Sequence, residues 1–381
     1  RCALADNKCR TTPPVLDSSA YGEMVRCFKS ALVADMPVAN RKSGKPGRAR
    51  QGSSGVALGL GDLAISYVKK DWLASLLTPG KVAPPSTVDG INIKIEKGET
   101  LGLVGESGSG KSTILKAISG LISPKEGELT LHGDGLLAPR VEDRSAMTLR
   151  QIQMIFQNPD DSLNPRHTVA QILAQPLRLY FGLSGGALLD ASADLLERVR
   201  LGAHYLDRLP SQLSGGEKQR VAIARAFAAE PDIVLCDEVT SALDVSVQAA
   251  VLDLLDELKA QQGTTYIFVS HDLAVVKAIS DRVAVLYQGR LCEIGSADAV
   301  YNAPFHPYTD VLLGAVLEPD PDTAPTLSAD DAVELSPPAF GCPFQRRCPR
   351  KLGDICDSKT PPAREFSNGH FINCHISTFD L

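Results

Sequence analysis

The stretch from Gly105 to Thr113 constrains the fold of this chain more than any other feature. It matches the phosphate-binding pattern G-x-x-x-x-G-K-[ST], and a strand-like apolar run before it and a helix-like run after it give the context that the motif requires. Glycines let backbone N–H groups surround phosphates at a helix N-terminus. The alternative is an ordinary flexible Gly/Ser-rich loop, but such a loop does not require a Lys-Ser pair at the end of the motif. Lys111 would reach the β- and γ-phosphates, and Ser112 would bind magnesium. The predicted nucleotide-binding residues are Gly105, Glu106, Ser107, Gly108, Ser109, Gly110, Lys111, Ser112 and Thr113.

The composition excludes several classes of protein. The 381 residues are 44% hydrophobic, which is typical of globular domains with a buried core, and the net charge of −6 gives no general signature of nucleic-acid binding. No run approaches the roughly eighteen consecutive apolar residues of a membrane-spanning helix. The chain begins with Arg rather than Met and carries no signal peptide, so we expect it to continue a longer polypeptide. Nine cysteines without a secretory signal favour metal binding or free thiols over disulfides.

Composition also divides the chain into segments. Residues 31–60 are rich in Gly, Ser, Ala and basic side chains and are typical of a flexible linker, although a basic tail that contacts RNA or lipid headgroups is an alternative. From about Leu60 to Ile294 strand-like and helical patterns alternate, which predicts an α/β domain with a largely parallel sheet. The expected segments are 1–30, the end of a preceding tail; 31–60, the linker; 61–300, the main domain; and 301–381, a C-terminal extension that is rich in cysteine.

Residues 1–30 repeat the pattern of the C-terminal tail. Seventeen residues separate Cys9 from Cys27, and seventeen separate Cys356 from Cys374. The other matched positions are Arg1-Cys2 with Arg347-Cys348, Pro13-Pro14 with Pro361-Pro362, and Gly22 with Gly369. We therefore expect residues 1–30 to end a preceding copy of the same unit, and the rest of the chain to be the second half of a tandem repeat.

A second element of a phosphate site runs from Ile233 to Glu238. An apolar strand that ends in two carboxylates matches the Walker B pattern. Asp237 would hold magnesium, and Glu238 would polarise the attacking water as a general base. Two acids after a buried strand can instead cap a helix. The phosphate-binding loop upstream favours the nucleotide-binding interpretation.

The sequence Leu-Ser-Gly-Gly-Glu at 213–217 lies between these two elements. It resembles the LSGGQ signature of the ATPase subunits of ABC transporters, with Glu217 in place of the common Gln. A Ser N-cap before an ordinary helix is the alternative, but the motif lies one helix ahead of the Walker B strand, as in that family. The resemblance covers roughly residues 60–315. It implies an α/β P-loop NTPase fold of the ABC ATPase type, with a parallel-sheet core, an antiparallel β element and a helical signature subdomain. It also implies nucleotide contacts, across a pair of ATPase domains, from Ser214, Gly215, Gly216 and Glu217.

Four more positions match elements of this family. Gln157 matches the Q-loop residue that senses magnesium and the attacking water and connects to the membrane subunits. Asp244 ends a match to the D-loop, and Val239 replaces a proline that is common after the catalytic glutamate. His271 matches the switch histidine that contacts the γ-phosphate. Tyr67 would stack on adenine, with an ordinary core aromatic as the alternative.

The C-terminal region narrows the resemblance. The segment from Ala303 to Thr309 resembles the His-Pro-Tyr-Thr segment of dipeptide, oligopeptide and nickel importer ATPases; by itself it would indicate a turn that leads into a helix. The tail resembles that of the peptide importers, in which four thiolates hold a 4Fe-4S cluster. Zinc and free thiols are the alternatives. The ligands would be Cys342, Cys348, Cys356 and Cys374, with Cys2, Cys9 and Cys27 as three ligands of the preceding copy's cluster. Two further cysteines are expected to be inert in the core: Cys236 and Cys292.

Together these features indicate the second ATPase half of a tandem ABC importer subunit for di- or oligopeptides, with ATP and Mg²⁺ as cofactors. The resemblance implies a partner ATPase half in the same polypeptide, two transmembrane permease subunits and an extracytoplasmic peptide-binding protein, and no nucleic-acid partner. It implies a place at the cytoplasmic face of the inner (plasma) membrane. A soluble tandem ABC protein that acts on ribosomes or nucleic acid is the alternative from another class. Nickel, opine or sugar cargo is the alternative among importers, because the ATPase never touches the cargo.

Overall fold

The computed structural model describes most of the chain from residue 55 onward. The described residues are 55–67, 86–133, 135–241, 243–315, 338, 340–367, 369–377 and 380–381, with positions 8, 11, 14, 17–18, 24–25 and 28–29 nearer the N-terminus. The chain divides into two units, Arg1–Gln51 and Gly52–Leu381. The expected ligands of a preceding cluster, Cys2, Cys9 and Cys27, lie outside the described residues, as does most of the expected linker.

Five parallel strands form the core of the larger unit. In spatial order they are β11 (Arg282–Tyr287), β5 (Thr100–Val104), β10 (Thr265–Val269), β9 (Ile233–Asp237) and β8 (Ile152–Ile155). Successive side chains of a strand point to opposite faces. Ile233 and Leu235 accordingly join one buried apolar cluster, and Val234 and Cys236 join the other. The largely parallel sheet that the sequence predicted is confirmed, and apolar clusters cover both of its faces.

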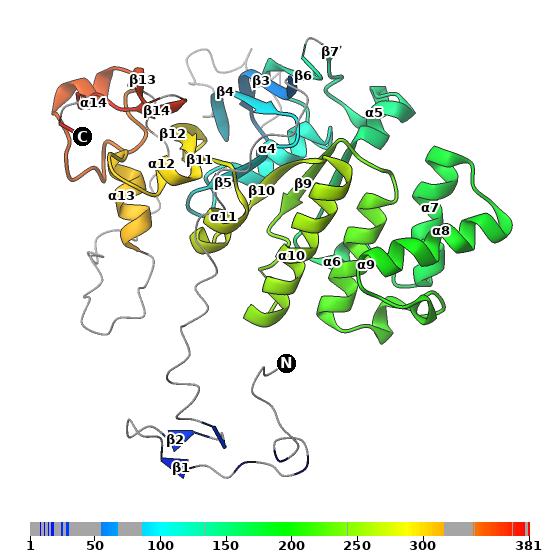
Figure 1. Cartoon of the computed structure of the whole chain (residues 1–381). Helices are drawn as coiled ribbons and strands as arrows, with labels where there is room; N and C mark the ends of the chain where they lie inside the picture. Colours follow the sequence, from blue (N-terminus) through cyan, green and yellow to red (C-terminus); the bar gives the residue numbers. More distant parts are fainter. Residues whose placement is uncertain are drawn as a thin grey trace, which may run out of the picture. The chain divides into compact units, whose positions relative to one another are not determined.

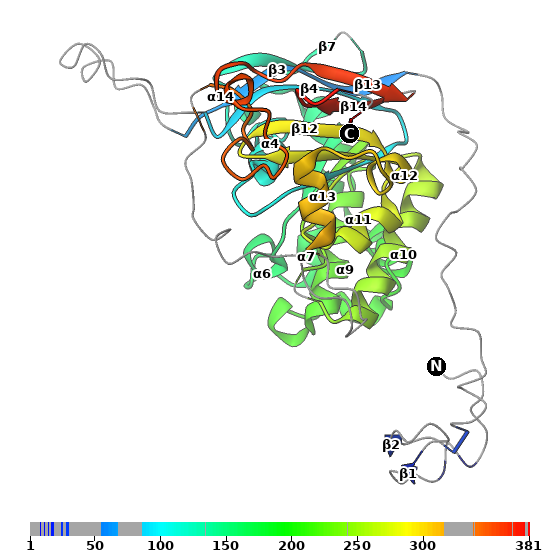
Figure 2. The same ribbon diagram turned by 90° about the vertical axis from the view of Figure 1, so that its left-hand side faces the viewer.

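Three antiparallel strands extend this sheet beyond β11. In order outward they are β12 (Arg290–Ser296), β14 (His370–Asn373) and β13 (Ala363–Ser367). Glu293 pairs with Ile372 and Ile294 with Phe371, so segments far apart in sequence lie side by side. The C-terminal tail therefore forms the outer edge of the main sheet, and both views place it beside β12 (Figures 1 and 2).

A second, antiparallel sheet covers helix α4 (Lys111–Ile118). Its strands, in order, are β4 (Val88–Glu96), β3 (Val56–Ile65), β6 (Glu126–Leu131) and β7 (Gly135–Leu136). Leu115 of α4 shares one buried cluster with Leu58 of β3 and Leu101 of β5, so the helix is packed between the two sheets. The expected antiparallel β element is confirmed.

Helices cover the other face of the central sheet. They are α9 (Gly215–Phe227), α10 (Val245–Gln262) and α11 (Leu273–Ile279), while α7 (Val169–Phe181) and α8 (Gly185–Arg198) pack on each other and on α9 (Figure 1). This group contains the expected helical subdomain. The shorter helices are α5 (Ala146–Gln151), α6 (Pro159–Ser162), α12 (Ala297–Val300), α13 (Pro307–Gly314) and α14 (Asp354–Ser358), with 3₁₀ turns at Val141–Asp143, Ala203–Tyr205 and Pro210–Gln212. In the part of the chain that the structure describes, no helix is long and apolar enough to cross a membrane.

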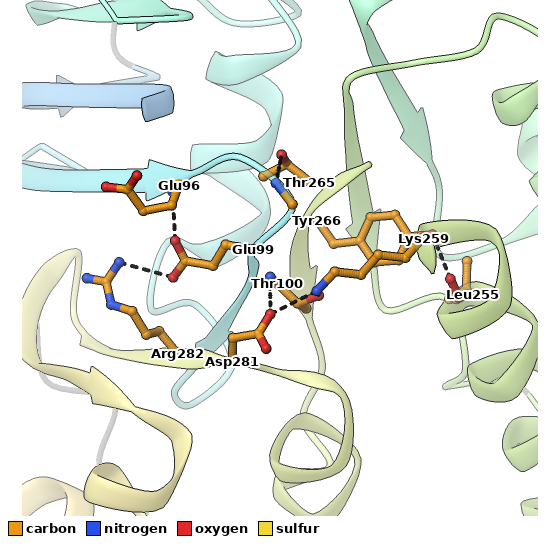
Figure 3. Close-up of polar contacts among 10 residues, drawn as sticks. Glu96, Glu99, Thr100, Leu255, Lys259, Thr265, Tyr266, Asp281 and Arg282 are labelled. Atoms are coloured by element: carbon orange, nitrogen blue, oxygen red, sulfur yellow. Dashed lines mark hydrogen bonds and ion pairs between the residues drawn. The ribbon is translucent and has the colours of Figure 1, made fainter. Parts of the chain in front are cut away.

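A polar network fixes the amino ends of the central strands (Figure 3). Lys259 of α10 donates from Nζ to the Asp281 carboxylate at 2.8 Å and to the Thr100 hydroxyl at 2.6 Å. Arg282 donates to the Glu99 carboxylate at 3.0 Å. Burial raises the pKa of Glu99, and the Arg282 charge opposes that rise. These pairs lie at the strand ends opposite the phosphate-binding loop, so their role is to hold the sheet together.

The smaller unit contains a two-stranded antiparallel hairpin, β1 (Asp17–Ser18) with β2 (Met24–Val25). Each of its four paired positions stands at the same offset from Cys27 as a paired position of the β13–β14 hairpin stands from Cys374. The pairs are Asp17 with Val25 and Ser18 with Met24 in the first hairpin, and Arg364 with Ile372 and Glu365 with Phe371 in the second. The two hairpins thus share one register.

Candidate functional site

The loop between β5 and α4 has a backbone path that only glycine permits at two points. Gly105 has a φ of +145°, and a Cβ there would lie 2.1 Å from the carbonyl oxygen of Leu286. Gly110 has a φ of +98°, and its Cβ would lie 2.8 Å from Val88 Cγ2. No L side chain fits at either position. The glycines therefore let the loop close over the start of α4, where a helix N-terminus favours an anion.

Lys111 lies inside this loop. Its ammonium group donates to the carbonyl oxygens of Gly105 and Glu106 at 2.8 and 2.9 Å, and to the Ser109 hydroxyl at 3.3 Å. Burial lowers the pKa of Lys111, and nearby carboxylates, of which Glu238 acts most strongly, oppose this change. The carbonyl oxygens of the loop thus hold the Lys111 ammonium group at the place where the phosphates would bind.

The two expected magnesium ligands meet directly. Ser112 Oγ donates to Asp237 Oδ1 at 2.8 Å, which joins the start of α4 to the end of β9. Burial raises the pKa of Asp237; the Ser112 hydrogen bond opposes this rise and the neighbouring Glu238 carboxylate adds to it. A buried carboxylate beside a hydroxyl is a suitable oxygen donor set for Mg²⁺, and the cation would compensate the charge that burial disfavours. The residues present therefore fit the ion.

Glu238 is the centre of the expected catalytic group. Gln157 Nε2 donates to Glu238 Oε2 at 2.8 Å, and His271 Nδ1 lies 3.6 Å from the same oxygen. The three residues follow β8, β9 and β10, whose carboxyl ends meet at one edge of the sheet. Glu238 has a φ of +47°, which is uncommon for a residue other than glycine. The structure therefore brings together the side chains that the sequence predicted as catalytic.

Tyr67 lies beside the phosphate-binding loop. Its hydroxyl is 3.1 Å from Thr113 Oγ1, and the residue is 56% exposed. It is therefore not a core aromatic, which was the alternative interpretation. An exposed ring next to the loop is placed where it can contact a nucleotide base.

The signature residues begin a different helix. Ser214 Oγ accepts from the Glu217 N–H at 3.4 Å, and Glu217 Oε2 accepts from the Ser214 N–H at 2.7 Å, so the pair forms a capping box at the start of α9. The Tyr205 hydroxyl donates to Glu217 Oε1 at 2.5 Å, and this bond, with that from Ser214, lowers the pKa of Glu217. Asp244 is the N-cap of α10 without a side-chain cap bond. Among the described residues, no hydrogen bond or ion pair joins 214–217 or Asp244 to the phosphate-binding loop.

Comparison with known proteins agrees with this geometry. The family model described as "ABC transporter" matches residues 88–241, and that described as "Oligopeptide/dipeptide transporter, C-terminal region" matches residues 292–356. The oligopeptide transport ATP-binding protein OppF of Escherichia coli (strain K12) is 42% identical over 325 residues, which cover 84% of this chain and 96% of that protein. The chain belongs to the oligopeptide-transport family of ABC ATPases. The putative oligopeptide transport ATP-binding protein YkfD of Bacillus subtilis (strain 168) is 40% identical over 304 residues, or 78% of this chain and 91% of that one.

Solved structures share the fold of this ABC ATPase. The ATP-binding cassette MJ0796, in a dimeric post-hydrolysis state with ADP and Pi, is 28% identical with a TM-score of 0.53, and the match covers 63% of this chain and 98% of that chain. CbiO1 of Clostridium perfringens is 25% identical with a TM-score of 0.54, over 64% of this chain and 90% of that one. The predicted fold class, an α/β P-loop ATPase of the ABC type, is confirmed.

Two residues that the sequence did not assign to the nucleotide site contact the loop of this ABC ATPase. The Tyr308 hydroxyl accepts from the Glu106 N–H at 2.8 Å, and Arg347 Nη1 donates to both carboxylate oxygens of Glu106 at 3.0 and 2.9 Å. Tyr308 belongs to the His-Pro-Tyr-Thr segment, so that motif was the one available signal. No sequence pattern predicts the contact of Arg347 with Glu106, because the two residues lie 241 positions apart in the chain.

The four tail cysteines of this ABC ATPase, which are the expected metal ligands, interact electrostatically with one another. Cys342, Cys356 and Cys374 are buried and Cys348 is half-buried, and the Cys342 N–H donates to the Cys356 carbonyl oxygen at 2.8 Å. Burial raises the pKa of Cys342 to about 12 and also raises the pKa of Cys348 and of Cys374. Within the described ranges, no three Cys, His, Asp or Glu side chains are placed to hold a metal ion. The arrangement of these side chains therefore does not by itself show the expected four-thiolate site. Two other buried free thiols, whose pKa burial raises, are Cys236 and Cys292.

Proposed function

We propose that this chain binds and hydrolyses ATP to energise the uptake of di- or oligopeptides through an ABC importer. One observation carries the proposal: the chain combines an assembled phosphate site with a C-terminal region of the oligopeptide/dipeptide transporter type. Relatives with oligopeptide transport in their names match it over nearly their whole length.

In this proposal residues 105–113 bind the phosphates of ATP. Lys111 contacts the β- and γ-phosphates, and Ser112 and Asp237 hold magnesium, with Gln157 as a further ligand. The ion would neutralise charge on the phosphates during transfer. Tyr67 stacks on adenine, and its exposed position beside Thr113 supports that role.

Glu238 is the proposed general base. It would take the proton of the water that attacks the γ-phosphate, while Gln157 orients that water and His271 contacts the γ-phosphate. The contacts of Gln157 and His271 with one carboxylate oxygen of Glu238 support these roles, because all three groups must act on the same reacting atoms.

We infer that each ATP lies between two ATPase domains. Ser214, Gly215, Gly216, Glu217 and Asp244 would contact a nucleotide held by the partner's loop. They lie at the starts of α9 and α10, and no hydrogen bond or ion pair of the described residues joins them to residues 105–113, which supports that arrangement; the related cassette MJ0796 is dimeric. Two transmembrane permease subunits and an extracytoplasmic peptide-binding protein complete the importer, with this chain at the cytoplasmic face of the membrane.

We also infer that residues 1–30 are a second copy of the tail, fused behind an upstream ATPase half through the linker at 31–60. The matched cysteine spacing and the common hairpin register support this tandem. Peptide mapping of the protein from its native source tests it. Peptides that carry a further phosphate-binding loop on the same polypeptide are expected, and a native chain without one would exclude the fusion.

The four tail cysteines are proposed to bind a metal centre, an iron–sulfur cluster rather than zinc. Four thiols from one short segment that share electrostatic interactions support the proposal, since soft thiolates suit both centres. Anaerobic purification followed by iron, sulfide and zinc analysis tests it, with Cys356→Ser as the variant that should lose the metal. Zinc without iron, or neither metal, would decide against the cluster.

Reconstitution of the complete importer in proteoliposomes tests the transport function. ATP-dependent uptake of labelled di- and oligopeptides is expected, and it should be lost in a complex that carries Glu238→Gln. Nickel and sugar tracers serve as competing cargo. Uptake of these tracers without peptide uptake would overturn the cargo assignment and leave the ATPase assignment in place.

A further inference from the structure

The second residue of the phosphate-binding loop is held by the C-terminal region. Arg347 pairs with the Glu106 carboxylate, and the Tyr308 hydroxyl accepts the Glu106 N–H. The Arg347 side chain is only 16% exposed, and its guanidinium carbon lies 5.8 Å from the ring centroids of both Tyr287 and Phe344. The rings of Tyr287 and Tyr308 are themselves 4.6 Å apart. The rings of Tyr287 and Phe344 therefore restrict the position of the Arg347 guanidinium group that pairs with Glu106.

Glu106 in turn positions the lysine of the site. The carbonyl oxygen of Glu106 accepts from Lys111 Nζ at 2.9 Å and from the Ser109 N–H at 3.1 Å. One residue thus has its N–H bonded to Tyr308, its carboxylate to Arg347, and its carbonyl to the group that would contact the phosphates. A shift of Glu106 would move Lys111 with it.

The charge of Glu106 also needs compensation. A carboxylate in a loop that receives a triphosphate repels the ligand unless a cation neutralises it. The Glu106 side chain is 42% exposed, so solvent screens part of this effect. Among the hydrogen bonds and ion pairs of the described residues, Arg347 supplies the cation bonded to this carboxylate.

We propose that Arg347 and Tyr308 are positioning residues of the nucleotide site, through which the C-terminal region sets the affinity of the phosphate-binding loop for ATP. The proposal rests on the proposed role of residues 105–113 as the ATP site. Arg347 lies between Cys342 and Cys348, and Phe344 of the same segment packs on Tyr308, so both contacts with Glu106 depend on order in the cysteine tail.

Fluorescent MgATP-analogue binding to the full chain tests the electrostatic part. Arg347→Gln should weaken binding about 3- to 10-fold, because it leaves the Glu106 charge uncompensated. Glu106→Gln should not weaken it to that extent, and the double variant Arg347→Gln/Glu106→Gln should recover most of the loss. Arg347→Lys, which keeps the charge, should retain most of the affinity.

Arg350→Gln is the matched control, because the contacts of Arg350 are with the carbonyl oxygens of Asp380 and Leu381 in the tail itself. It should leave the affinity unchanged. Equal losses in Arg347→Gln and Arg350→Gln, or a loss that persists in the double variant, would overturn the proposal in favour of a general effect on the tail.

Lys111→Ala distinguishes failure of the positioning role from failure of the proposed ATP site. If it abolishes binding while Arg347→Gln has no effect, only the positioning role fails; if it also has no effect, the ATP site itself is wrongly placed.

Tyr308→Phe tests the second contact. It keeps the ring against Tyr287 and Phe344 but removes the acceptor of the Glu106 N–H, so we expect about 3- to 5-fold weaker binding of the analogue and a fall of only a few degrees in the thermal unfolding midpoint. Binding equal to that of the unaltered chain would show that the hydroxyl does not position the loop. Lower affinity together with a fall of about 10 °C or more in the unfolding midpoint would show that the substitution acts through general loss of packing.

Discussion

The Gln157 side-chain amide donates a hydrogen bond to the Glu238 carboxylate at 2.8 Å and so joins the ends of β8 and β9. The bond uses one of the several acceptor sites of the carboxylate, so Glu238 can hold Gln157 and still accept a proton from a bound water. In the proposed function, this bond would couple the position of Glu238 to the segment that follows β8.

Glu238→Gln should keep ATP binding and lose most turnover. Removal of a general base typically costs about 10²- to 10⁴-fold in rate, while the amide preserves the shape of the side chain. ATP hydrolysis by the assembled complex and analogue binding by the chain measure the two effects. Glu230→Gln is the control, since Glu230 forms a surface ion pair with Arg150. A turnover near that of the unaltered complex would reject Glu238 as the base.

Asp237→Asn should separate stability from activity. Burial raises the pKa of this carboxyl, so its ionised form costs free energy in the ion-free fold. Asparagine removes the charge and can still accept the Ser112 hydrogen bond. We expect a thermal midpoint a few degrees higher without magnesium, and loss of magnesium-dependent hydrolysis. A lower midpoint without magnesium would contradict the assigned cause.

The same variant gives a pH dependence of defined sign. A carboxyl whose folded pKa is raised stabilises the fold below its unfolded pKa, and that contribution is lost as the pH rises through the folded pKa. The stability difference between Asp237→Asn and the unaltered protein should therefore be largest near neutral pH and should shrink as the pH falls toward 4. Chemical unfolding in chelator over that range measures it. A difference that grows on acidification would refute the prediction.

The sequence predicted the parts of the molecule in which the chemistry of the site requires particular residues at fixed distances along the chain. Phosphate binding needs glycines at fixed offsets, so Gly105 and Gly110 marked the loop, and the apolar run before Asp237 marked a buried strand. The fold class followed from these motifs and is confirmed. The roles of individual site residues remain predictions, although the structure places most of them together.

What the sequence did not predict depends on contacts between distant segments. Arg347 looks like one of several basic residues in a tail, and only the pairing of β14 with β12 carries that tail to the main sheet. Likewise, no sequence pattern around Glu217 identifies Tyr205 as its hydrogen-bond partner. The Tyr205 hydroxyl comes from a separate 3₁₀ turn that packs beside the start of α9. Such contacts depend on tertiary packing, and tertiary packing does not produce a recurring pattern in the sequence.

Asp281→Asn should destabilise the fold by about 1–2 kcal/mol, because it leaves the Lys259 ammonium without its counter-charge at the amino end of the sheet. The Lys259 side chain is 9% exposed and that of Asp281 is 48% exposed, so the loss falls below that of a fully buried pair. Urea unfolding measures it. Glu126→Gln, which breaks the exposed pair with Lys125, is the control and should cost less than about 0.5 kcal/mol. Equal effects of the two substitutions would show that the Lys259 network does not stabilise the sheet.

Paired variants test whether hydrolysis needs two chains. Lys111→Ala disables the loop, and Ser214→Arg blocks the signature, so each purified variant should be inactive. A mixed dimer of the two still contains one site with an intact loop from one chain and an intact signature from the other. An equal mixture should therefore regain about a quarter of the unaltered activity, since half of randomly formed dimers are mixed and each has one working site of two. Light scattering at the assay concentration reports the association state. Hydrolysis by strictly monomeric protein, or a mixture as inactive as its components although mixed dimers form, would contradict the shared site.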